Sequence, residues 1–255
     1  EDYDRLSEVI PWLNEINMGA TAIGTGITAD PRYAELVREH LVEVTGIPME
    51  TAPDLIEATS DAGIFMTLSS NLKRAAVKLS KICNDLRLTS SGPQAGLGEI
   101  NLPPRQAGSS IMPGKVNPVI PEVVLQVSAQ VIGNDTAITV AGLQGQFELN
   151  VRIPLIARNL LQSLRLLSAA SRAFAEKCVD GIEANRGGTD ASAGATLAVA
   201  TALNGAIGYD KATVIVKKAT ASGRPLREVA LEEGVDAKLY DATIDLRKIA
   251  RGNRA

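Results

Sequence analysis

The segment whose residue types are best suited to catalysis or ligand binding is GSSIMPGKVNP, from Gly108 to Pro118. Its glycines and small hydroxyl groups allow backbone N–H groups to converge on an anion. Lys115 adds a fixed positive charge, and Asn117 adds a directed amide. Pro118 is suited to open a helix, whose N-terminal dipole also favours negative charge. Together these groups predict a site that stabilises a developing anion.

Three other features could support chemistry but are better explained by structure. GTG at Gly24–Gly26 could be mistaken for a phosphate loop, yet it lacks the strand–loop–helix context and fits a turn. The single histidine, His40, lies on a helix that we expect to be exposed, and we assign it no catalytic role. Cys83 and Cys178 have no partner spacing, so we expect buried thiols in a reducing compartment, the cytoplasm.

Three long helices are predicted on either side of this segment, over 59–90, 118–146 and 154–182. In each, apolar residues recur at alternating steps of three and four, which is typical of a left-handed bundle. The predicted contact positions are Phe65, Leu68, Leu72, Ala75, Leu79, Ile82 and Leu86; then Ile120, Val124, Val127, Val131, Asn134, Ile138 and Ala141; then Leu160, Leu164, Leu167, Ser171, Phe174 and Cys178. Such helices are rods of about 40 Å, which must pack lengthwise against one another and against further copies.

The chain is predicted to have two domains, a central helical bundle over 1–184 and a small helical domain over 185–255. The boundary is placed at NRGGTDASAG, which begins at Asn185 and is rich in glycine. The shorter predicted elements are a helix over 2–18, a loop over 19–31, helices over 33–44, 196–203, 209–222 and 225–232, and a frayed basic end.

Composition excludes several classes of protein. Among 255 residues, 45% are hydrophobic and 22% charged, so a packed core is expected rather than disorder. Aromatic residues make up only 3%, which favours helix-on-helix packing of aliphatic side chains. The net charge of −3 gives no basic excess, so nucleic acid is not an expected partner. No apolar run is long enough to span a bilayer, and no membrane association is expected.

The sequence resembles the aspartase/fumarase superfamily. GSSIMPGKVNP matches every fixed position of the signature loop of that superfamily, GSSxMPxKxN. PVIPEVV, from Pro118 to Val124, resembles the aspartate ammonia-lyase branch, as do INMGATAIGTGI and LKRAAVKLSKICNDLRLTSSGP. TALNGAIGYDKA resembles the class II fumarase form, with Gly205 in place of the usual proline. The resemblance implies an all-α fold with a long-helix bundle and a small helical C-terminal domain.

The resemblance also implies roles for the residues of the signature loop, 108–118. Ser109 would be the general base, and Glu122 a supporting catalytic carboxylate; by itself, Glu122 also suits a salt bridge or a helix cap. The expected substrate-binding residues are Ser110, Met112, Lys115 and Asn117. No metal and no organic cofactor is expected, because the elimination needs only cations and N–H donors around the anion.

The expected reaction is β-elimination from a C4 dicarboxylate, L-aspartate giving fumarate and ammonia. Fumarate hydratase is an alternative with the same loop, and a catalytically inactive helical oligomerisation scaffold is a second alternative. The family implies a homotetramer whose active sites each combine segments of three subunits. This chain carries one of the three, so it is expected to be incomplete alone. Agreement with the family also falls after Val124, for example in AGLQGQFELNVRIP over 141–154.

Overall fold

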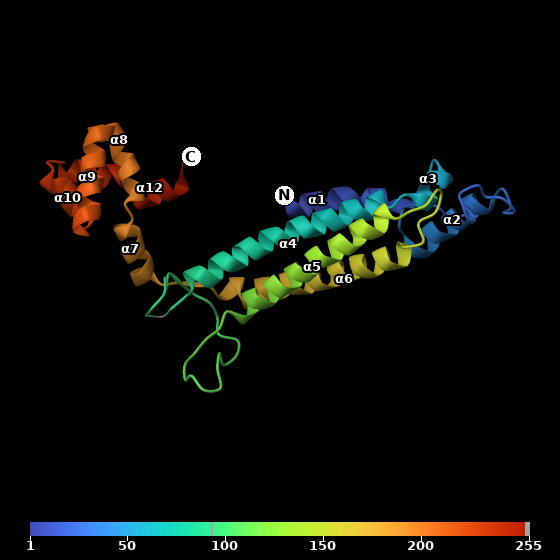
Figure 1. Cartoon of the computed structure of the whole chain (residues 1–255), viewed down its shortest axis with the longest axis horizontal. Helices are drawn as coiled ribbons and strands as arrows, with labels where there is room; N and C mark the ends of the chain where they lie inside the picture. The colour runs from blue at the N-terminus through green and yellow to red at the C-terminus, as the bar shows by residue number, and fades with distance from the viewer. Residues whose placement is uncertain (93, 253–255) are drawn as a thin grey trace. The chain divides into compact units, whose positions relative to one another are not determined.

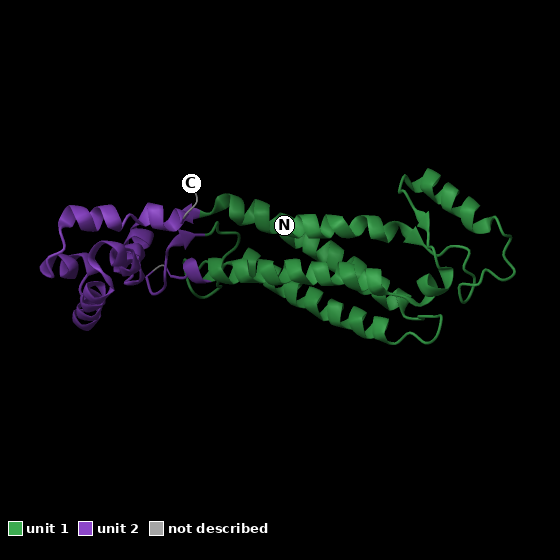
Figure 2. Cartoon of the chain, turned by 90° about the horizontal axis from the view of Figure 1, so that it is seen from above, with its two compact units in different colours: residues 1–87, 102–182 green, residues 88–101, 183–255 purple. Residues whose placement is uncertain are grey.

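The computed structural model describes residues 1–92 and 94–252, and it divides the chain into two compact units. The first unit comprises residues 1–87 and 102–182, and the second comprises residues 88–101 and the chain from Glu183 onward (Figure 2). The predicted domains, 1–184 and 185–255, differ from these units chiefly at 88–101. No helix in the described part of the chain is both long and apolar enough to cross a membrane.

Three long helices form the first unit and lie lengthwise beside one another (Figure 1). They are α4 (Gly63–Thr89), α5 (Val119–Leu143) and α6 (Ile153–Lys177), followed by the short 3-10 helix η2 (Val179–Gly181). The first predicted helix begins later than expected, because α3 (Leu55–Ser60) is a separate helix. Asp54 caps α3 through the N–H groups of Ile56 and Glu57, and the extended backbone of Asp61 ends it.

The predicted contact positions of the bundle are mostly correct. One apolar cluster joins α4, α5 and α6 along most of their length, and a second cluster around Cys83, Val124 and Phe174 lies near the start of α5. Two predicted positions are wrong, since Ile82 and Ser171 are exposed. The adjacent residues Cys83 and Ala170 are buried instead, and so are Ala76 and Ser163, which the pattern did not include. The alternating steps of three and four therefore identified the buried face of each helix, but not every residue on that face.

The end of the first unit away from the signature loop is more irregular than predicted. The expected helix over 2–18 stops early, as α1 (Asp2–Val9) gives way to the 3-10 helix η1 (Ile10–Asn14) with Pro11 in its first turn. The strand β1 (Glu15–Ile16) then pairs in parallel with β2 (Glu50–Thr51). Between them, α2 (Tyr33–Thr45) ends at Gly46, which adopts a left-handed conformation with φ of 69°.

The second unit begins with a small antiparallel pair, β3 (Ile100–Asn101) and β4 (Glu183–Ala184). The glycine-rich segment over 185–194, which the sequence suggested to be a break between helices at the domain boundary, is instead helical as α7 (Arg186–Ala195). Asn185 starts this helix, with its side-chain oxygen accepting from the N–H of Gly188 and its amide donating to the carbonyl of Gly98 at 2.7 Å. Capping and this distant contact outweigh the low helix propensity of the glycines.

The remaining helices of the second unit surround an apolar core that includes Leu203, Ile215 and Ala230. They are η3 (Ala198–Leu203), α8 (Asn204–Ile207), α9 (Tyr209–Ser222), α10 (Leu226–Glu232), α11 (Ala237–Thr243) and α12 (Leu246–Arg251). The bounds predicted for α9 are correct. The predicted frayed end is wrong over 246–251, because Asp245 caps a helix there; residues 253–255 lie outside the described residues.

Candidate functional site

The signature loop enters from a fixed anchor on the end of α6. Nε of Arg105 donates a hydrogen bond of 2.7 Å to the backbone carbonyl of Lys177. This carbonyl belongs to the last turn of α6, where the helix dipole favours a positive charge. Pro103 packs beside Gly181, where an added Cβ would lie 3.0 Å from Cγ of the proline. The chain therefore reaches the loop from a defined position.

Two hydrogen bonds on Gly108 close the base of the loop. The N–H of Gly108 donates to the carbonyl of Lys115 at 2.8 Å, and the side-chain amide of Asn117 donates to the carbonyl of Gly108 at 3.0 Å. A Cβ at position 108 would lie 2.6 Å from the carbonyl oxygen of Lys115, so only glycine fits this neck. Gly114 turns the chain with φ of +76°. Residues 108–117 thus form a closed loop, seen beyond the start of α5 in Figure 1.

The hydroxyl oxygen of Ser109 accepts two backbone hydrogen bonds within the loop. Its Oγ accepts hydrogen bonds from the backbone N–H groups of Ile111, at 3.2 Å, and Met112, at 3.1 Å. The two donors lie two and three positions after the serine, whose side chain is half-buried. Two N–H dipoles aimed at one oxygen favour its deprotonated form over the neutral hydroxyl.

The other predicted site residues divide into two groups. Lys115 and Asn117 lie at the neck together with Gly108, next in sequence to Ser109, and Asn117 retains a second N–H and its side-chain oxygen for other partners. Ser110 and Met112 lie on the exposed tip of the loop, and Lys115 is also exposed. The loop therefore holds Ser109, Lys115 and Asn117 within one closed segment.

Glu122 lies in the first turn of α5, one helical turn beyond the loop. One of its carboxylate oxygens is 4.0 Å from a guanidinium nitrogen of Arg87 at the end of α4. Both side chains are about two-fifths exposed, so the attraction is screened by water. In this structure, Glu122 makes the salt bridge that its sequence also suggested.

A small cavity beneath the loop is lined in part by Arg105, a residue that the sequence analysis did not identify. The cavity is lined by Leu102, Pro103, Arg105, Pro118, Val119, Ile120, Pro121, Lys177 and Cys178. Arg105 connects the loop to α6 across this cavity, yet its partner carbonyl is 72 positions later in the sequence. Only its place in the run PPRQAG, directly before the signature loop, could have indicated a role.

The two cysteines confirm the prediction of buried, unpaired thiols, since both are free and buried in the cluster near the start of α5. Burial raises the pKa of the Cys83 thiol to about 11, and it also raises the pKa of Cys178. Neutral, enclosed thiols are chemically inert. His40 is exposed on α2, and Gly24 and Gly26 lie in a turn with positive φ.

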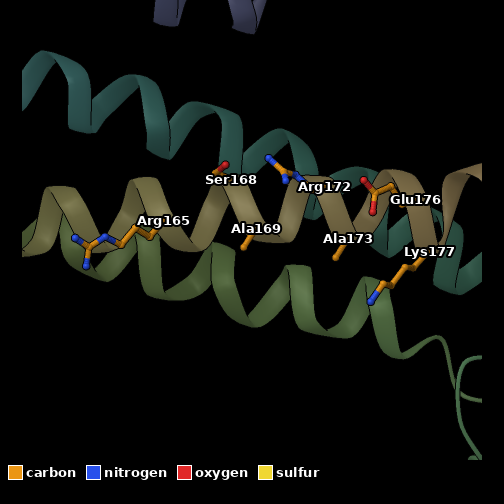
Figure 3. A pocket seen from close by; sticks show the side chains of 7 residues that line it. All are labelled: Arg165, Ser168, Ala169, Arg172, Ala173, Glu176 and Lys177. Carbon is orange, nitrogen blue, oxygen red and sulfur yellow. The ribbon is translucent and has the colours of Figure 1, made fainter.

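A second hollow lies on the outer face of α6 and is drawn in Figure 3. Its lining residues are Arg165, Ser168, Ala169, Arg172, Ala173, Glu176 and Lys177. All of them come from one helix, so the hollow is an open helix face rather than an enclosed site. Among the residues that the structure describes, no group of three or more His, Cys, Asp or Glu side chains could hold a metal ion.

The first unit is a bundle of long helices with a closed, glycine-rich loop between two of them, and comparison with known proteins places this architecture among the helical lyases. The family described as Lyase matches residues 1–133, and the family described as Fumarase C C-terminus matches residues 199–251. The chain therefore belongs to the lyase family of the aspartase and fumarase type. This confirms the resemblance carried by residues 108–118.

Two curated relatives show how much of the family the chain represents. The aspartate ammonia-lyase of Pseudomonas aeruginosa is 53% identical over 98% of this chain and 53% of its own length. The aspartate ammonia-lyase of Escherichia coli is 48% identical over 96% of this chain and 51% of its own length. The chain thus spans about half the length of the curated relatives it matches.

Two solved structures confirm the all-helical bundle. The structure described as fumarate lyase:delta crystallin from Brucella melitensis bound to cobalt matches with a TM-score of 0.91 and 51% identity, covering 98% of this chain and 54% of that chain. Class II fumarase from Schistosoma mansoni matches with a TM-score of 0.92 and 32% identity, covering 99% of this chain and 56% of that chain.

Proposed function

We propose that the protein containing this chain is an ammonia-lyase that converts L-aspartate into fumarate and ammonia. The observation that carries the proposal is the pair of N–H groups, from Ile111 and Met112, that donate to Oγ of Ser109. A serine hydroxyl is ordinarily too weak an acid to serve as a base. Two fixed donors make its alkoxide accessible, which is what a serine base requires.

The chemistry follows from where charge develops. Removal of a Cβ proton next to a carboxylate forms an aci-carboxylate dianion, which must be met by cations and N–H donors. The alkoxide of Ser109 takes this proton, and the C–N bond then breaks to release ammonia. Lys115 and the remaining N–H of Asn117 hold carboxylate oxygens of the substrate, while Ser110 and Met112 line the pocket. The roles given to these four loop residues and to Ser109, and L-aspartate as the substrate, all belong to this proposal.

Glu122 has a supporting part in this proposal. It lies one helical turn from the loop and within 4.0 Å of Arg87, so it holds negative charge near the start of α5 without touching Ser109 in the described geometry. In this role, Glu122 orients a positively charged side chain that comes from another segment of the protein. The alternative role, a salt bridge that only joins α4 to α5, predicts that its loss changes stability but not turnover.

Aspartate is favoured over malate because the curated relatives that are about half identical over nearly the whole chain are named aspartate ammonia-lyases. The fumarase from Schistosoma mansoni has lower identity, at 32%. An inactive scaffold is the third possibility. It is disfavoured by the loop, because a neck that admits only glycine and a doubly hydrogen-bonded serine have no use in a scaffold.

The proposed active protein is a homo-oligomer, a tetramer by the family pattern. Ser110, Met112 and Lys115 of the loop are exposed, and large apolar side chains such as Ile10, Trp12, Val77 and Leu161 are exposed along the first unit. Exposed apolar surface of this extent is typical of surfaces that other chains cover. We further propose a cytoplasmic location, supported by the two free thiols, and a reaction without metal or organic cofactor.

The test is the ultraviolet absorbance of fumarate formed by the full-length protein from L-aspartate or L-malate. We expect a signal with aspartate, and loss of it in Ser109→Ala with the oligomer unchanged by size-exclusion chromatography. Ser168→Ala, on the outer face of α6, serves as the matched control. A signal with malate alone would favour the hydratase, silence with both would favour the scaffold, and activity in Ser109→Ala would exclude the assigned base.

A further inference from the structure

Two positively charged side chains border the small cavity beneath the signature loop. Arg105 and Lys177 both line it, and its other lining residues are apolar apart from the Cys178 thiol. Within the described part of the chain, neither cation forms an ion pair. Glu122, on the nearby first turn of α5, lies beside Arg87 instead. The cavity is therefore lined by two positive charges that no carboxylate offsets in the described structure.

The guanidinium group of Arg105 is held in place by only one of its N–H groups. Its Nε donates to the backbone carbonyl of Lys177 at 2.7 Å. A guanidinium has five N–H donors, so the four on its two Nη atoms remain for another acceptor. Burial raises the pKa of the Cys178 thiol, and the positive charge of Arg105 partly opposes this rise, so that charge is felt at the cavity. Arg105 thus presents a fixed, planar set of donors.

Lys177 brings the second charge to the same place. Figure 3 shows its side chain extending from α6 toward α5, whereas Glu176 points toward the opposite side of α6. Glu176 and Asp180, its nearest acidic neighbours in sequence, form no ion pair with Lys177 in the described structure. The backbone carbonyl of Lys177 is also the acceptor for Arg105. Both charges are therefore tied to one residue at the end of α6.

These side chains, rather than the helix ends, decide the sign of the charge at the cavity. The start of α5 and the end of α6 both border it. The positive end of one helix dipole and the negative end of the other are each equivalent to about half a charge, so they largely offset each other. Two full positive charges remain, and they favour a ligand that carries two negative charges.

The dimensions of the cavity restrict where a ligand can lie. Its enclosed part has room for about one water molecule, so a larger group must lie at the mouth. The side chains of Arg105 and Lys177 are exposed and can reach a group placed there. A planar guanidinium and an ammonium group suit a tetrahedral oxyanion, which accepts hydrogen bonds on several oxygens at once. A phosphate group also carries close to two negative charges at neutral pH.

We propose that Arg105 and Lys177 form a binding site for a small oxyanion of the phosphate type, and that the bound anion stabilises the anchor of the signature loop. The anion accepts from the Nη groups of Arg105 while Nε keeps its bond to the carbonyl of Lys177. Additional bonds to the same guanidinium favour the anchored state over the open one. No residue to which the reaction is assigned takes part in this site.

Phosphorus NMR of inorganic phosphate, mixed with the full-length protein at constant ionic strength, tests the binding. We expect line broadening that saturates with a dissociation constant on the order of 1 mM, as suits a solvent-exposed site. Lys177→Gln keeps the backbone carbonyl and hence the anchor, and it should weaken binding by about fivefold. Lys177→Arg should retain binding, and so should the matched control Arg165→Gln on the outer face of α6. Equal binding by Lys177→Gln and the unmodified protein, or no binding by either, would overturn the site.

Limited proteolysis tests the effect on the loop. At a phosphate concentration about twice the dissociation constant, trypsin should cut after Lys115 about threefold more slowly in the unmodified protein, and at an unchanged rate in Lys177→Gln. Equal slowing in both proteins would place the anion on the loop itself, and equal slowing by chloride would show screening alone; either result would overturn the stabilised anchor. Neither measurement depends on turnover, so an inactive protein would count against the proposed function and not against this site.

Discussion

Lys73 and Asp135 form an ion pair of 2.5 Å between α4 and α5, and Oγ of Ser69 donates to the other carboxylate oxygen at 2.8 Å. The side chain of Asp135 is only 7% exposed, whereas that of Lys73 is 41% exposed. On the preceding residue, the side-chain amide of Asn134 donates to Oγ of Ser163 on α6 at 3.0 Å. Adjacent residues of α5 therefore fix the positions of both neighbouring helices.

We expect Asp135→Ala to destabilise the bundle by about 2–3 kcal/mol, because it leaves Ser69 without its acceptor and opens a void in the core. The free energy of unfolding from urea titration, followed by circular dichroism, measures this. Glu8→Ala, in an exposed pair with Arg5 on one helix, is the matched control and should change stability by less than about 0.5 kcal/mol. Equal effects of the two changes would contradict a special role for Asp135.

A second prediction concerns the anchor of the signature loop. Arg105→Ala removes the hydrogen bond to the carbonyl of Lys177, so we expect the loop to open more often while the bundle stays intact. Trypsin should then cut after Lys115 about tenfold faster, with the melting temperature nearly unchanged. Arg158→Ala, on an exposed part of α6, should leave the cleavage rate unchanged. A cleavage rate in Arg105→Ala equal to that of the unmodified protein would refute the anchor.

A third prediction concerns the neck of the loop. Gly108→Ala places a Cβ 2.6 Å from the carbonyl oxygen of Lys115, so the neck must open and Ser109 must lose its position. In the full-length protein we expect at least about a hundredfold loss of kcat/KM without a change in the melting temperature of the bundle. Gly194→Ala, whose Cβ would meet nothing within 4 Å, is the control and should have full activity. Retained activity in Gly108→Ala would show that the neck does not position the serine.

Much of the fold was predictable because the long helices bury their apolar residues at helical spacing. Val124, Val131, Ile138 and Ala141 follow that rule along α5, and all are buried. The exposed Ile82 and the buried Ala76 show its limit, because helices cross at an angle and a regular pattern drifts off the contact face. The pattern could not reveal the turn from α1 into η1, where Pro11 interrupts it.

The chemical site was predictable only in part. The residue types of the signature loop indicated an anion site, and the position of Ser109 beside two N–H donors agrees with that reading. The contact of Arg105 with Lys177 spans the whole of α5 and α6, so no local pattern encodes it. For the same reason, the sequence did not indicate α7: its glycines have low helix propensity, and the hydrogen bond from Asn185 to the carbonyl of Gly98 stabilises its start. Residues brought together by tertiary structure leave little trace in local spacing.

The last prediction concerns alkaline pH. Burial raises the pKa of Cys83 from 9.0 to about 11, so the folded state holds the thiol proton more tightly than the unfolded state does. The resulting stability is complete below pH 9 and is lost as the pH rises from 9 to about 11. Cys83→Ala lacks this titration, so its deficit in unfolding free energy relative to the unmodified protein should shrink across that window.

Urea titrations of both proteins at several pH values measure this difference, and the sign is fixed by linkage. Val124→Ala is the matched control, because it removes a buried side chain of the same apolar cluster as Cys83 and has no titrating group. Its deficit should stay constant with pH. A constant deficit for Cys83→Ala as well would mean that the thiol titrates alike in the folded and unfolded chains, and that water reaches the junction of α4 and α5 beneath the signature loop.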